Sequence, residues 1–106
     1  MNLDTLLDRL EATKCPVALG AFADPVPGMP YILYSFSGCT PFYADGEVYY
    51  CFSKISITVC AKKKDLLLET RMRIALRGNA YRRTETKNES ENRYEYTYDL
   101  EVTENV

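Results

Sequence analysis

Residues 93–102 read RYEYTYDLEV, and this stretch decides the fold because its apolar and polar residues alternate strictly. Successive side chains of a β-strand point to opposite faces of a sheet, so a period of two predicts a strand with one buried face. The buried face is expected to carry Tyr94, Tyr96, Tyr98, Leu100 and Val102. The other face holds Arg93, Glu95, Thr97, Asp99 and Glu101, and it is predicted to be acidic.

The segments before this strand extend the same pattern. Residues 80–87, followed by a polar break at 88–92, predict the first half of a hairpin that ends in 93–102. Residues 47–60 predict another strand, in which Ile55, Ile57 and Val59 face a core. The part of that strand from Val48 to Phe52 is apolar on both sides, so it is either covered on two faces or projects into a partner.

Two helices are predicted from apolar stripes. Leu3, Leu6, Leu7 and Leu10 recur at helical spacing, which predicts a helix over about residues 3–13 that ends before Pro16. The second helix lies within residues 61–79 and ends at Gly78-Asn79. Its apolar side is expected to comprise Leu67, Leu68, Met72, Ile74 and Ala75.

The remaining segments complete a single domain over residues 1–106. Strands are predicted at 17–22 and 31–37, separated by a loop that holds three prolines. The order of elements is then α-β-β-β-α-β-β. Because hairpins dominate this order, we expect an α+β two-layer sandwich, with a mostly antiparallel sheet and two helices packed on one face.

Composition argues against catalysis, cofactors and metals. The chain has no histidine, the usual general base at neutral pH, and no G-x-S-x-G motif. Its four cysteines show no C-x-x-C spacing, and the first residues do not resemble a signal peptide, so we expect reduced, structural thiols. No apolar run approaches the roughly 18 to 20 residues of a membrane span. The expectation is a soluble, non-enzymatic protein without a small-molecule substrate.

Charge is segregated along the chain. Residues 62–83 hold eight cations and two acids, a net of +6, whereas residues 84–106 hold two cations and seven acids, a net of −5. This pattern allows three interpretations. The basic stretch binds phosphates, the basic patch of one copy meets the acidic patch of the next in a ring, or both are solvated surfaces.

Four segments together resemble a known protein group. They are CPVALGAFADPVPGMPYILYSFSG at 15–38, PFYADGEVYY at 41–50, ISITVCAKKKDLLLETRMRIAL at 55–76 and TETKNESENRYEYTYDLEV at 84–102. Their layout is similar to small proteins of tailed bacteriophages and prophages that are encoded between the head and tail genes. The resemblance is to the tail terminator, or tail completion, group.

This resemblance implies a virion protein, made in the bacterial host cytoplasm and located at the head–tail junction. It implies a homo-oligomeric, hexameric ring that caps the tail tube and contacts the tail tube protein and the head-side connector. Genome DNA would pass through the lumen without specific binding. One side of the subunit contact would carry Arg71, Arg73, Arg77, Arg82 and Arg83. Glu95, Asp99 and Glu101 would form the other side or line the lumen.

The loop between the predicted strands, FSGCTPFYADGEVYYCF at 36–52, also carries a hypothesis. Gly38 and Pro41 are expected to break the strand, and Asp45-Gly46 to turn the chain back. Aromatic clusters at a solvent-facing tip are typical of interfaces. The predicted contact residues are Phe42, Tyr43, Asp45, Tyr49 and Tyr50.

Two alternatives remain at this level. The first is another neck protein, a head–tail adaptor or stopper. The second is a small nucleic-acid-binding regulatory domain that uses the basic stretch 62–83, with a tyrosine such as Tyr49 or Tyr50 stacking on bases.

Overall fold

The computed structural model describes residues 2–22, 27–44, 47–88 and 93–105, and it describes side chains for these residues except 39–44, 47–51, 88 and 104–105. Two helices, α1 (Leu3–Glu11) and α2 (Leu66–Ala75), and five strands occur in the order α1-β1-β2-β3-α2-β4-β5. The strands are β1 (Val17–Leu19), β2 (Tyr31–Ala44), β3 (Glu47–Ala61), β4 (Arg82–Asn88) and β5 (Arg93–Asn105). The predicted α+β class, with a five-stranded sheet and two helices, is confirmed.

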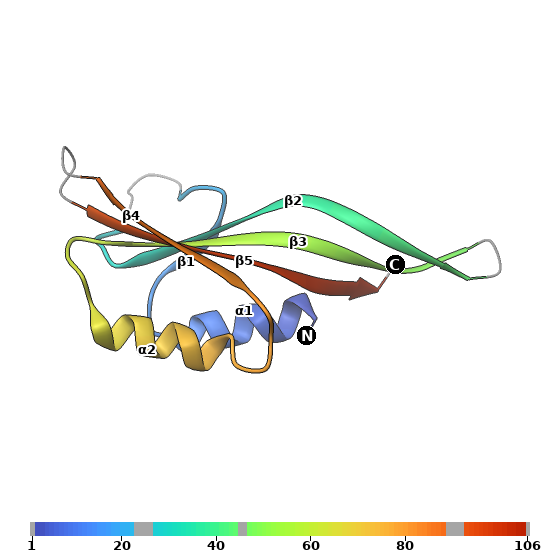
Figure 1. Cartoon of the computed structure of the whole chain (residues 1–106), viewed down its shortest axis with the longest axis horizontal. Coiled ribbons are helices and arrows are strands. Elements are labelled where there is room, and N and C mark those ends of the chain that lie inside the picture. Colours follow the sequence, from blue (N-terminus) through green and yellow to red (C-terminus); the bar gives the residue numbers. More distant parts are fainter. Residues whose placement is uncertain (1, 23–26, 45–46, 89–92, 106) are drawn as a thin grey trace.

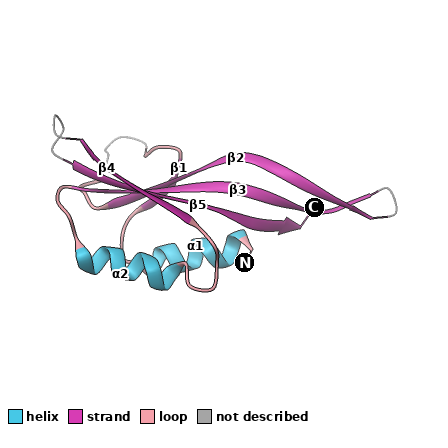
Figure 2. Ribbon diagram, viewed as in Figure 1, coloured by secondary structure: helices cyan, strands magenta, loops and turns pink. Residues whose placement is uncertain are grey.

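The sheet is mixed, with the strand order β1-β2-β3-β5-β4. The short β1 runs parallel to β2, and the other three pairings are antiparallel. Figure 1 shows both helices along the same side of the sheet, while β2 and β3 extend as a long hairpin beyond the region that the helices cover. Figure 2 shows the same arrangement by element type.

The core lies between the helices and the sheet. The inward residues of β3 and β5 are buried as predicted, except that Tyr94 is only partly buried against the core. Ile57, Val59, Tyr96 and Val102 are at most 1% exposed. Leu6 and Leu10 of α1 pack into the same cluster, with Leu68 and Met72 from α2 and Leu76 at its C-cap. The stripe of leucines predicted on the first helix is therefore confirmed.

Both helices have an N-cap residue of a type that favours helix initiation. The side chain of Asn2 accepts a hydrogen bond from the Thr5 amide at 2.8 Å, and Asp65 accepts one from the Leu68 amide at 3.1 Å. Each bond satisfies an amide that has no partner within its own helix. After α2, Gly78 adopts a φ of 86°, a left-handed conformation that glycine tolerates without steric cost.

One prediction about β2 is wrong. Gly38 and Pro41 do not break the strand, which continues to Ala44 and pairs with β3 along its length. The register shifts between Phe36 and Gly38, where Ser37 is the extra residue of a bulge. Within the described residues, the part of β2 after Tyr34 pairs only with β3, so its other side is an edge of the sheet. Proline is tolerated on an edge strand because a backbone N–H that points away from the sheet has no strand to bond. Cys39 accordingly lies in a strand, not in a turn.

The predicted apolar side of α2 is also partly wrong. Leu67 and Ile74 are 61% and 58% exposed, whereas Leu68, Met72 and Ala75 are buried. The buried residues recur at i, i+4 and i+7. Leu67 and Ile74 share a different stripe, rotated by about 100° because an α-helix has 3.6 residues per turn. The apolar residues of this segment therefore form two stripes, one of which faces solvent.

Two of the four cysteines have described side chains. Cys15 is partly buried, Cys60 is buried, and both are free thiols. Burial raises the pKa of the Cys60 thiol, which keeps it protonated and unreactive at neutral pH. Cys60 lies in the core and Cys15 packs against it, as expected of structural thiols, and their reduced state stays a prediction.

A pair of isoleucines tests this assignment of inner and outer faces. We expect Ile57→Ala, in β3, to lower the free energy of unfolding by about 2–5 kcal/mol, because it leaves a cavity in the core. Ile74→Ala, the same change on the outer side of α2, should cost less than about 0.5 kcal/mol. Urea unfolding of the two variants measures both values, and equal losses would contradict the assignment.

Candidate interaction surfaces

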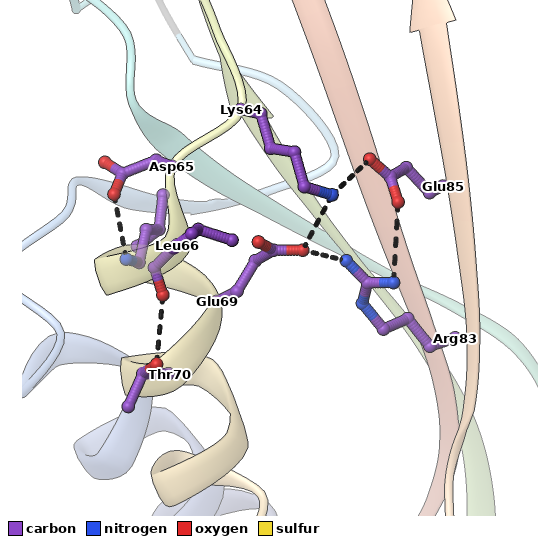
Figure 3. Close-up of polar contacts among 8 residues, drawn as sticks. Lys64, Asp65, Leu66, Glu69, Thr70, Arg83 and Glu85 are labelled. Atoms are coloured by element: carbon purple, nitrogen blue, oxygen red, sulfur yellow. Dashed lines mark hydrogen bonds and ion pairs between the residues drawn. The ribbon is translucent and has the colours of Figure 1, made fainter.

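A network of four charged side chains joins α2 to β4 (Figure 3). The Lys64 ammonium lies 3.1 Å from a carboxylate oxygen of Glu85 and 3.7 Å from one of Glu69. The Arg83 guanidinium contacts Glu69 and lies 3.7 Å from Glu85. Each cation thus contacts both acids, and the network fixes the start of α2 against the edge strand.

Arg83 also packs on the aromatic core. Its guanidinium carbon lies 5.0 Å from the ring centroid of Tyr96 and 6.0 Å from that of Tyr98, within range of cation–π attraction. The hydrogen bond that the Arg83 guanidinium donates to the Tyr98 side chain is the largest cause that raises the pKa of Arg83. Arg83 is therefore engaged by groups of its own chain and is a poor candidate for the subunit contact.

The five predicted contact arginines do not form one surface. Arg82 and Arg83 are consecutive strand residues, so their side chains point to opposite faces of the sheet. Arg82 lies opposite Asp99 in the β4–β5 pairing, and Arg83 lies opposite Tyr98. Arg71, Arg73 and Arg77 belong to α2 and the turn after it, and all three are exposed. The structure therefore divides the set into three locations, which are the groove between the helices with Arg71 and Arg77, the hollow beside β4 with Arg73 and Arg83, and the other face of the sheet with Arg82.

Arg71 and Arg77 border a groove of about 240 Å³ between the helices, together with Arg9 of α1. The Arg9 guanidinium donates to the carbonyls of Ala75 at 3.4 Å and Arg77 at 3.2 Å. Arg71 donates to the carbonyl of Thr13 at 3.5 Å. Each helix thus sends one arginine to carbonyls at the C-terminal end of the other, where cations are favoured.

Arg9 was not among the predicted residues. It is the single cation of α1, and only the antiparallel contact of the two helices brings it close to Arg71 and Arg77. The sequence holds a weak signal, since Arg9 is the basic residue in the last turn of α1.

The predicted acidic residues lie on the face of the sheet that points away from the helices. Each of them has a cation as a neighbour. Arg93 lies 2.8 Å from Glu95, Arg82 lies across from Asp99, and Lys54 lies across from Glu101. Asp99 also accepts a hydrogen bond from the Ser56 hydroxyl at 2.5 Å. The acids on the outer face of β5 are therefore each offset by a cation, because β5 itself supplies Arg93 and the neighbouring strands supply Arg82 and Lys54.

The predicted hairpin contacts fall at the far end of β2 and β3. The backbones of Phe42 and Tyr50 are directly paired, as are those of Tyr43 and Val48. The side chains of Phe42, Tyr43, Tyr49 and Tyr50, and the whole of Asp45, lie outside the described residues. Their role as contacts stays a prediction.

Among the described residues, no group of three His, Cys, Asp or Glu side chains could hold a metal ion. Neither helix in the described part of the chain is long and apolar enough to cross a membrane.

Comparison with models of known protein families gives no match to this chain. A comparison with curated proteins gives no match either.

The buried tyrosines predict how stability depends on pH. Burial is the main cause that raises the pKa values of Tyr96 and Tyr98 in the folded chain. The unfolded chain loses these protons near pH 10, so above that pH it binds fewer protons than the folded chain. The stabilisation is therefore complete below about pH 10 and is lost as the pH rises further.

We expect the free energy of unfolding to fall as the pH rises above about 10, and to fall less steeply in Tyr96→Phe and Tyr98→Phe. Urea unfolding across this range, with tyrosinate absorbance followed in parallel, measures the slope. An unchanged slope in both variants would contradict the assignment.

Proposed function

We propose that this protein is a structural component of a phage virion, a tail terminator or tail completion protein of the head–tail neck. In this proposal it acts without catalysis or a cofactor. It assembles on the tip of the tail tube as a hexameric ring, which caps the tube and joins it to the head-side connector. The finer fold expected of that group, a two-layer sandwich with two helices on one face of the sheet, is part of the proposal.

One observation carries the proposal most directly. The hairpin of β2 and β3, with strands of 14 and 15 residues, extends beyond the helix-covered part of the sheet (Figure 1). A paired, protruding hairpin can reach a neighbouring subunit or a tail protein, and its sequence there holds Phe42, Tyr43, Tyr49 and Tyr50. Aromatic residues are enriched in protein contacts.

The charge pattern does not favour the outer face of β5 as a ring contact. A ring contact between a basic and an acidic patch needs surfaces with net charge, and the sheet face with Glu95, Asp99 and Glu101 is balanced by its cationic neighbours. We therefore propose the hairpin, rather than that face, as the principal contact with neighbouring virion proteins.

The nucleic-acid alternative receives less support. A track for phosphates needs cations gathered on one surface. The cations of residues 62–83 are divided, with Lys64 and Arg83 paired to acids, Arg71 turned to a carbonyl and Arg82 on the other face of the sheet. An adaptor or stopper of the same neck remains the nearest alternative.

The hairpin proposal is tested by the double variant Phe42→Ala/Tyr43→Ala. We expect it to fold normally and to be incorporated into particles at least about tenfold less, since a few aromatic anchors carry most of an interface's energy. Phe36→Ala, a matched change on the same strand nearer the core, should be incorporated normally. Electron microscopy of particles produced with each variant, and with the gene deleted, provides the readout.

Loss of a terminator predicts overlong or headless tails. Normal tails after deletion of the gene would overturn the neck assignment. Normal incorporation of the double variant would overturn the role of the hairpin.

A further inference from the structure

The outer surface of the helical layer carries two stripes of opposite charge. On α1, Asp4, Asp8 and Glu11 recur at i, i+4 and i+7, so they lie on one side of the helix, and all three are exposed. On α2 and the turn after it, Arg71, Arg73 and Arg77 are exposed. Arg71 and Arg77 border the groove toward α1, whereas Arg73 lies on the side of α2 toward β4, beside Leu66. The two helices lie side by side, joined by the bonds of Arg9 and Arg71.

These stripes do not neutralise one another within one chain. In the part of the chain that the structure describes, none of these six side chains forms an ion pair. Arg71 turns to the carbonyl of Thr13 instead. The helical layer therefore offers unpaired acids and unpaired bases next to each other.

An apolar strip lies between the arginines. Leu66, Leu67 and Ile74 are 69%, 61% and 58% exposed, and these three make up half of the large hydrophobic side chains that are exposed among the described residues. Exposed apolar side chains gathered on one element, with charges around them, are typical of an interface. This surface, formed by the two stripes and the apolar strip, is called the outer helical face below.

The two helices run antiparallel, and their contacts show which residues of α1 and α2 lie at the same height along the helix axes. Arg9 reaches the carbonyls of Ala75 and Arg77, and Arg71 reaches that of Thr13. Glu11 is therefore level with about Arg73 and Ile74 on the neighbouring helix, and Asp8 is level with the end of α2.

We propose that the outer helical face binds a second copy of this chain through a two-fold axis parallel to the helices. Such an axis places α1 of each copy over α2 of the other. Glu11 of each copy then faces Arg73 of its partner, and the apolar strip of each copy is covered. Two-fold contacts require a surface that is complementary to itself, and the acids of α1 provide it when they face Arg73 of the other copy. The groove along the axis is lined by Arg9, Arg71 and Arg77, of which Arg9 and Arg71 donate to helix-end carbonyls.

A second copy fits this face better than a nucleic acid does. A phosphate backbone laid across this face would meet the exposed carboxylates of α1 as well as the arginines, and like charges facing each other are unfavourable. The contact is also separate from the hairpin, so it stands whether or not the protein acts in a phage neck.

The size of the face predicts weak association. Helices of nine and ten residues are about 14–15 Å long at a rise of about 1.5 Å per residue. Two helices side by side span about 20 Å, which makes a footprint well below the roughly 800 Å² per partner of a stable interface. We expect a dimer that depends on concentration and weakens with salt.

The test is sedimentation velocity of the whole chain over a wide concentration range, at about 0.1 M and about 1 M salt, where the Debye lengths are about 10 Å and about 3 Å. Dimers should form at the lower salt and weaken at the higher. Glu11→Arg and Arg73→Glu should each weaken association at least about tenfold, because each sets like charges against each other. Mixed in equal amounts, the two variants should form a heterodimer, in which both contacts are again complementary.

Glu101→Arg, the same chemical change on the opposite face of the sheet, is the matched control and should dimerise as the parent does. Ile74→Ala provides a second probe that alters no charge and should also weaken association. Circular dichroism checks that each variant is folded. A wild-type chain that stays monomeric at all concentrations would overturn the proposal, as would dimers that Glu11→Arg, Arg73→Glu and Ile74→Ala leave unchanged.

Discussion

The antiparallel pairing of β3 with β5 is the constraint on which the rest of the structure depends. Its register places the apolar residues of both strands on the same face of the sheet. Ile55, Ile57 and Val59 lie directly opposite Leu100, Tyr98 and Tyr96. One side of this pair is therefore continuously apolar and must be covered. With one short helix unable to cover it alone, α1 and α2 together form the layer that does so.

Covering the sheet also determines which side chains remain outside. The buried stripe of α2 fixes its rotation, and this rotation leaves Leu67 and Ile74 in solvent. Glu69 and Arg83 then hold the start of the helix against β4, while Arg9 and Arg71 hold the two helices to each other. The packing of the core thus determines which side chains make up the outer helical face.

The sequence predicted what depends on local periodicity. The strand 93–102, the inward residues of 47–60 and the leucine stripe of α1 all follow from the spacing of apolar residues, and the structure confirms them. It could not predict what depends on neighbouring strands and helices. The face of β5 that looked acidic is balanced by Lys54 and Arg82, which come from other strands, and Arg9 gains its partners only when the helices pack.

Two further misses have local causes. The second apolar stripe of α2 could not be distinguished from the first by composition, since both consist of leucine and isoleucine. Gly38 and Pro41 are ordinary strand breakers, but an edge strand with a bulge accommodates both. The hairpin is consequently longer than its sequence suggested, and this length is what gives it reach.

The central claim is that the outer helical face is a contact surface for a second copy. Amide chemical shifts recorded by NMR during dilution test it most directly, because they report the contact residue by residue without any substitution. The account predicts that the shifts that change lie in residues 4–12 and 66–77. Changes confined to residues 54–58 and 95–101, on the opposite face of the sheet, would contradict it.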